Sequence, residues 1–179
     1  MKYFIVRQDK KYKNTPIIKN WIQNYDIKSL QEGRYSKLPS YQSFFIEPSE
    51  NTVFLDILVN PYFLCSLQVK KVLELFEPNM KYHDIVLIDK TTQTVNQYFL
   101  PELKPIDCLL KESVFDKNHF HLEKAVLNPD KIGQTSIFRL HGVEEQTVVI
   151  RLDLVEMLLR KGIKGLSIFE TAIKEPVLF

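Results

Sequence analysis

The stretch NHFHLEKAVLNPDKIGQTSIFRLHGVEEQTVVIRLDLVEMLLRKGIKGLSIFE, residues 118–170, decides the fold of this chain. Residues 147–152 (TVVIRL) and 166–169 (LSIF) are β-branched and apolar runs, which are typical of strands. Between them, residues 154–161 have the apolar spacing of a short helix. The stretch therefore predicts short strands, a tight turn, a helix and a final strand. No position in it has the spacing of a nucleophile, a metal cage or a phosphate cradle.

Local signals define both ends of this helix. Asp153 with Glu156 three residues later matches a capping box, in which each side chain accepts a hydrogen bond from an unpaired backbone N–H group. Gly162 suits the left-handed residue that ends a helix, and Arg160 and Lys161 complement the negative end of the helix dipole.

The rest of the chain continues this mixture of strands and helices. Residues 3–7 and 43–47 are predicted strands, and 53–58 is a plausible hairpin partner for 43–47. From Ser66 the period changes, because Val69, Val72, Leu73 and Phe76 fall on one face of a helix. Further short strands are predicted at 84–89, 95–100, 106–110, 124–127 and 136–140.

These elements predict an α+β fold with a mostly antiparallel, multi-stranded sheet and two or three helices. Pro61 closes the predicted hairpin region and the period changes from Ser66, which together divide the chain into a small N-terminal lobe (residues 1–62), strand-rich and basic, and a larger C-terminal α+β body (residues 63–179).

Composition and charge are those of a soluble globular protein. The 179 residues are 45% hydrophobic and 26% charged, and the net formal charge is +2. Residues 1–40 hold nine basic and three acidic side chains, a net charge of +6, whereas residues 41–179 hold fifteen basic and nineteen acidic, a net charge of −4. The N-terminal apolar run is too short for a signal-peptide core, and no run approaches a membrane span. We therefore expect a cytoplasmic protein with no membrane partner.

The histidines carry the main enzymatic alternative. His119 and His121 lie on one face of an extended segment, and with Asp116, Glu123, His83 or His141 they would make a hydrolytic metal site. Two histidines two residues apart need a third ligand that the sequence does not place. Histidines on the surface are the expected outcome, so we predict no metal.

Other chemistry has little support. Cys108 and Ser113 lie in no turn that would expose and activate a nucleophile. Cys65 and Cys108 stand in apolar stretches, which predicts buried free thiols, and the five glycines form no phosphate-binding loop. The sequence therefore predicts no enzyme and no cofactor.

A nucleic-acid-binding module is the second alternative. The aromatic residues Tyr35, Tyr41, Phe44 and Phe45 lie near the basic lobe, and aromatics interleaved with basic residues can stack on bases. No recognisable nucleic-acid-binding motif accompanies them, so core packing is expected and no nucleic acid is predicted as a partner.

Asp107 and Arg139 are charged residues inside apolar, strand-like runs. Each side chain either faces water through the alternation of a strand, or is a buried or groove-lining charge that needs a partner. We predict both as candidate partner-binding residues.

The order of segments from about residue 66 to 170 resembles the immunity-protein-11 family of bacterial polymorphic toxin systems. Pro105-Ile106-Asp107-Cys108 followed by Ser113 is similar to a family strand that ends in an Asp-Cys step with a nearby serine. Residues 137–140 (IFRL), Val149-Ile150, the helix 154–159 and residues 162–165 (GIKG) are similar to the later elements. Residues 151–153 (RLD) depart from the family pattern, which has a serine-type helix cap there.

The resemblance implies a non-catalytic protein that binds and blocks a cognate protein toxin encoded beside it. Such inhibition needs a complementary surface rather than a reaction centre. The basic lobe would suit an acidic partner and the mildly acidic body a basic one.

Overall fold

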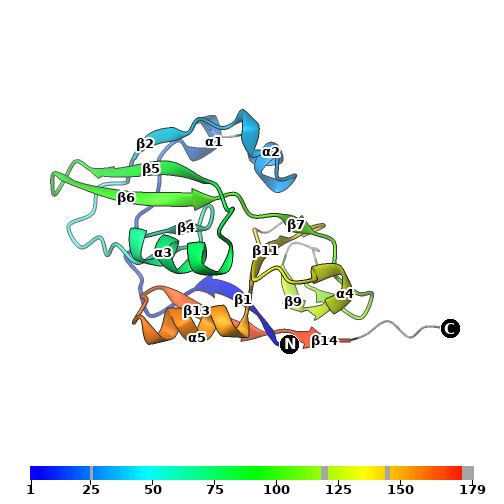
Figure 1. The fold of residues 1–179 in the computed structure, drawn as a ribbon. Coiled ribbons are helices and arrows are strands. Elements are labelled where there is room, and N and C mark those ends of the chain that lie inside the picture. Colours follow the sequence, from blue (N-terminus) through cyan, green and yellow to red (C-terminus); the bar gives the residue numbers. More distant parts are fainter. Residues whose placement is uncertain (25, 118–120, 144–145, 175–179) are drawn as a thin grey trace.

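The computed structural model describes residues 1–24, 26–117, 121–143 and 146–174. These residues form two five-stranded sheets, two shorter strand pairs and five α-helices (Figure 1). The α+β class predicted from the sequence is confirmed. No helix in these residues is long and apolar enough to cross a membrane.

The first sheet has the strand order β13–β1–β12–β11–β7. These strands are Leu166–Glu170, Tyr3–Gln8, Val148–Arg151, Ile137–Leu140 and Pro105–Ile106, in that order. β1 pairs antiparallel with β13 and β12, β11 pairs antiparallel with β12, and β11 and β7 are parallel. The N-terminal strand therefore lies between two strands from the C-terminal part of the chain.

The second sheet has the order β2–β5–β6–β4–β3, in which only β2 and β5 are parallel. Its strands are Tyr41–Phe45, Tyr82–Asp89, Thr94–Pro101, Leu64–Cys65 and Ile57–Leu58. β5 and β6 form a long hairpin on one side of the molecule (Figure 1), and β5 buries every second side chain.

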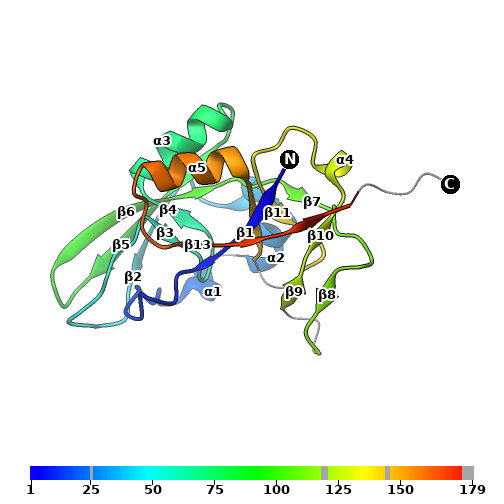
Figure 2. The ribbon, with the colours of Figure 1, turned by 90° about the horizontal axis from the view of Figure 1, so that it is seen from below.

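Two further strand pairs cover one end of the first sheet. β8 (Val114–Phe115) pairs antiparallel with β9 (Leu122–Lys124), and β10 (Val126–Leu127) pairs parallel with β14 (Ala172–Ile173). Figure 2 shows β13 leading directly into this second pair.

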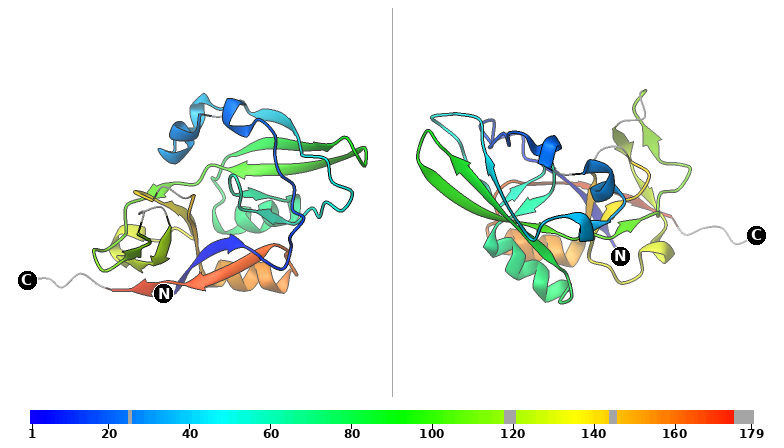
Figure 3. Two further views of the ribbon diagram at one scale, coloured as in Figure 1. Left: turned by 180° about the vertical axis from the view of Figure 1, so that it is seen from behind. Right: turned by 90° about the horizontal axis from the view of Figure 1, so that it is seen from above.

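The two longer helices are α3 (Leu67–Phe76) and α5 (Leu152–Arg160). They pack against each other, and their buried residues form one core with strands of both sheets. Three shorter helices are α1 (Trp21–Asn24), α2 (Ile27–Gln31) and α4 (Pro129–Ile132), and a 3-10 helix spans Tyr35–Lys37. The two views of Figure 3 show α1 and α2 on the side of the second sheet, away from α5.

The cap predicted for α3 is confirmed, because Ser66 Oγ accepts a hydrogen bond from Val69 N at 3.4 Å. The predicted end of α5 is also confirmed. Gly162 has φ +68°, and its N–H donates to the carbonyl of Leu159.

Most strand pairs of the two five-stranded sheets are antiparallel, as predicted, although each of these sheets is mixed, with one parallel pair. Three expectations need correction. The described helices number five rather than two or three, because α1, α2 and α4 span only four or five residues and show no apolar period. Residues 53–58 do not pair with 43–47: only Ile57–Leu58 is a strand, and it pairs with β4. The N-cap of α5 is Arg151, not Asp153, so the predicted capping box is absent there.

Both sheets combine strands from before and after residue 62, since β1, β2 and β3 precede it and their partners follow it. The division into residues 1–62 and 63–179 stays a prediction.

Candidate functional site

Arg139 is a buried charge with partners, one of the two alternatives considered for it. It lies on β11, is 4% exposed, and donates hydrogen bonds to the carbonyl oxygens of Leu30 and Gln31. A further hydrogen bond joins Arg139 Nη1 to Gln146 Oε1 at 3.0 Å. The two carbonyls end α2, where the partial negative charge of the helix favours a cation. Burial lowers the pKa of Arg139 below its usual range.

Asp107 faces water, which is the other of the two alternatives considered for these charged residues. Its side chain is 71% exposed, and Lys131 Nζ lies 3.5 Å from its carboxylate. Asp107 follows β7, the parallel neighbour of β11, so the two predicted residues lie on adjoining segments but in different environments. Their role in partner binding stays a prediction.

The described histidines have different environments. His83 is buried, with Nδ1 2.8 Å from the carbonyl of Pro39 and Nε2 2.9 Å from Glu102 Oε1. His121 and His141 are exposed, and His119 lies outside the described residues. Within the described ranges, no three His, Cys, Asp or Glu side chains gather in a way that could hold a metal ion.

Both thiols are buried, as predicted. Burial raises the pKa of Cys108 to about 12 and raises that of Cys65 as well, so each is a protonated thiol at neutral pH. Ser113 has a structural role, since its Oγ accepts from Val126 N at 3.0 Å and donates to the Val126 carbonyl at 3.2 Å.

The aromatic residues of the basic lobe divide between core and surface. Tyr35 and Phe44 are buried, as expected for core packing, whereas Tyr41 and Phe45 are exposed. The Lys90 ammonium lies 3.9 Å from the centre of the Phe45 ring, so this exposed ring already has a cationic neighbour.

A cavity of about 830 Å³ opens beside β13, and we call it the β13 groove. It is lined by Ile5, residues 7–11, residues 121–125, Ser167 and residues 169–172. Sequence reasoning missed this groove, because its walls come from three segments that only the tertiary fold brings together. A partial signal was present in the apolar pattern of residues 166–169.

Arg7 lies on β1 and contacts the two other segments that line the β13 groove. Its Nη2 donates to the carbonyl of Leu122 at 2.8 Å, and its guanidinium lies 5.6 Å from the centre of the Phe169 ring. Leu122 and Ile5 are buried, whereas the Phe169 ring is 51% exposed. The groove thus has an apolar base and an exposed aromatic ring at its rim, which are features of protein-binding sites.

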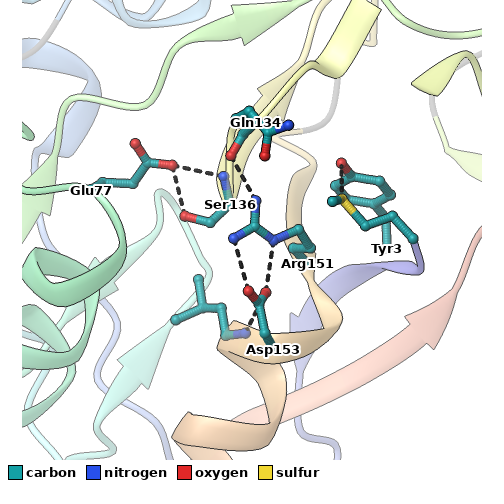
Figure 4. A network of polar contacts seen from close by, with 8 residues as sticks. Tyr3, Glu77, Gln134, Ser136, Arg151 and Asp153 are labelled. Atoms are coloured by element: carbon teal, nitrogen blue, oxygen red, sulfur yellow. Dashed lines mark hydrogen bonds and ion pairs between the residues drawn. The ribbon is translucent and has the colours of Figure 1, made fainter. Parts of the chain in front are cut away.

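A polar network holds the first sheet against α3 and α5 (Figure 4). Glu77 Oε1 accepts two hydrogen bonds from Ser136, from N and Oγ, both at 2.7 Å. Arg151 donates to both carboxylate oxygens of Asp153 at 2.8 Å and to the carbonyl of Gln134 at 2.7 Å. The hydrogen bonds from Arg151 lower the pKa of the Asp153 carboxyl. This network positions β11 and the start of α5.

Residues 8–172 match the model of the immunity protein family Imm11. The chain belongs to the Imm11 family. Among curated proteins, none matches the chain. The family match extends well beyond the segments that carried the resemblance, residues 66–170, and includes the basic N-terminal segment from Gln8 onward. The residues that line the β13 groove, apart from Ile5 and Arg7, therefore lie within the matched part of this Imm11 protein.

Proposed function

We propose that this Imm11 protein binds a cognate protein toxin inside the producing cell and neutralises it without catalysing a reaction. The observation that carries the proposal is membership of an immunity protein family over residues 8–172. Neutralisation by binding needs a stable surface of complementary shape, and the proposed partner is the toxin encoded beside it.

The β13 groove is the surface that we propose for the toxin. Its buried residues Ile5 and Leu122 are apolar, and the Phe169 ring is exposed. The lining also holds exposed charges of both signs, among them Lys10, Lys11, Lys124, Glu123 and Glu170. Exposed aromatic side chains beside a cavity are frequent binding hot spots, and mixed charges favour a partner surface that carries both signs.

Asp107 remains proposed as a second contact, because its carboxylate is exposed beside Lys131. Arg139 is proposed to act indirectly, by fixing α2 against β11 through Leu30 and Gln31. A buried arginine held by carbonyl oxygens positions the surface around it rather than touching the toxin.

The test measures binding between the purified protein and the C-terminal domain encoded by the neighbouring reading frame. We expect a 1:1 complex by calorimetry, and Phe169→Ala to raise Kd at least about tenfold. Leu159→Ala is the matched control, because Leu159 is an exposed apolar residue on α5 outside the groove. No measurable complex with the wild-type protein would refute the proposed function. Equal changes of Kd for the two variants would refute only the assignment of the β13 groove as the toxin-binding surface.

A further inference from the structure

We propose that the outer edge of β13 accepts an extended strand of the toxin, which adds to the first sheet within the β13 groove. This inference rests on the proposed function. β13 is the terminal strand of its sheet, and among the described residues it pairs only with β1. An unpaired strand edge presents a row of N–H and C=O groups that can bind another strand.

The pairing register fixes which backbone groups of β13 point outward. Thr171 N donates to the carbonyl of Tyr3, and the β1–β13 register continues through Ile5 opposite Phe169 and Arg7 opposite Ser167. In an antiparallel pair, alternate residues bond to the partner strand. Ser167, Phe169 and Thr171 therefore bond to β1, and the N–H and C=O groups of Leu166, Ile168 and Glu170 point away from it.

The next residues along the chain already use this outer edge. Ala172 N donates to the carbonyl of Ala125 and Lys174 N donates to that of Leu127, in the parallel β10–β14 pair. The residues that precede β10, 121–125, do not continue along the outer edge of β13, because the Leu122 carbonyl binds Arg7 on β1. Residues 121–125 and β13 therefore diverge at Ala125, and the β13 groove opens between them.

An added strand would thus continue the line of β10 alongside β13. Its side chains alternate between the two faces of the sheet. Those on the face of Ile5 and Phe169 would enter the groove and meet its apolar base. The geometry points to a toxin strand without proline at its bonded positions and with apolar side chains at alternate positions.

Glu170 offers a specific test, because its side chain is exposed and its N–H points to the outer edge. Glu170→Pro removes that N–H and leaves the hydrogen bonds between β13 and β1 in place. Glu170→Ala is the matched control, since it loses the 2.8 Å ion pair with Lys2 but keeps the N–H. The probe is the C-terminal domain encoded by the neighbouring reading frame.

We expect Glu170→Pro to raise Kd for this domain about tenfold or more over Glu170→Ala, with equal melting temperatures for the two variants. Hydrogen exchange of the wild-type complex is the second measurement, which applies even where the proline variant misfolds. The amides of Ile168 and Glu170 should gain protection on binding, while those of Ser167 and Phe169 are protected already.

Three outcomes would overturn the strand-addition proposal. Equal Kd values for the two Glu170 variants, or no gain of protection at Ile168 and Glu170, would leave toxin binding intact and place it elsewhere. A homodimer of the wild-type protein that Glu170→Pro abolishes would assign the edge to a second copy of this chain. No complex with the wild-type protein would refute the proposed function itself.

Discussion

The guanidinium of Arg139 donates a hydrogen bond to the main-chain carbonyl of Leu30, 109 residues earlier in the chain. Through this bond and the one to Gln31, β11 holds the end of α2. Gly33 follows α2 with φ +71°, and a Cβ there would lie 2.8 Å from the ring of Pro105 on β7. The N-terminal helical segment and the first sheet are therefore joined by a buried charge and a close backbone approach.

Replacing Arg139 with alanine should destabilise the protein strongly. The change leaves the carbonyls of Leu30 and Gln31 without their charged donor, at a cost of about 3 kcal/mol in the free energy of unfolding. Asp107→Ala is the control and should change this free energy by less than about 0.5 kcal/mol, because that side chain faces water. Urea denaturation measures both, and equal losses for the two variants would contradict the assigned environments.

Glu77→Ala should also destabilise the fold. Glu77 accepts both hydrogen bonds of the fully buried Ser136, whose N–H and hydroxyl would lose their partner at a cost of about 2 kcal/mol. Glu74 is exposed on α3 and lies 3.9 Å from Lys70, so Glu74→Ala should cost only about 0.3 kcal/mol. A thermal melt in which Glu74→Ala lowers Tm as much as Glu77→Ala would show that the hydrogen bonds between Glu77 and Ser136 do not stabilise the fold.

The Arg151–Asp153 ion pair predicts a small dependence of stability on pH. Because Arg151 lowers the pKa of Asp153 below its ordinary value of 3.8, the carboxylate stabilises the native state above that value. This contribution is lost as the pH falls through the lowered pKa. The Asp153 side chain is 51% exposed, although that of Arg151 is only 15% exposed, so Asp153→Asn should cost about 0.3 kcal/mol at pH 7.

Denaturant titrations of wild type and Asp153→Asn across pH 2 to 7 would measure this effect. The two stabilities should converge at the acid end. A difference that grows toward low pH would have the wrong sign for a lowered carboxyl pKa.

Gly165→Ala should be the most damaging of the glycine substitutions. Gly165 has φ +91°, and an added Cβ would lie 2.5 Å from the carbonyl oxygen of Ile57, so the start of β13 would have to move. We expect a loss of about 3 kcal/mol from combined strain and overlap. Gly162→Ala meets no atom within 4 Å at φ +68° and should cost about 1 kcal/mol. Urea denaturation of both variants measures these costs. Similar losses in the free energy of unfolding for Gly165→Ala and Gly162→Ala would mean that the start of β13 does not approach Ile57 this closely.

Local signals predicted the elements that have a period or a cap. The apolar spacing of Val69, Val72 and Leu73 and the hydroxyl of Ser66 gave α3 correctly, and β-branched runs located β1, β12 and β13. At α5 the local pattern misled, since Asp153 binds Arg151 and Leu154 N instead of capping from the N-cap position.

The sequence did not predict the features that depend on contacts between distant segments. The parallel pairing of β2 with β5 and of β7 with β11 follows from how the chain returns to each sheet. The environments of Asp107 and Arg139 could not be distinguished from their neighbours, because both lie in apolar runs. The β13 groove depends on where residues 121–125 leave β14, which no local pattern records.

Protection of growing cells tests the toxin-neutralising function most directly. Cells that express the toxin domain of the neighbouring gene would be co-transformed with wild type, Phe169→Ala or an empty vector, and colony counts compared. We expect wild type to restore growth and Phe169→Ala to restore it less. Cells that die equally with wild type and with empty vector, although the protein is folded and abundant, would contradict a neutralising role.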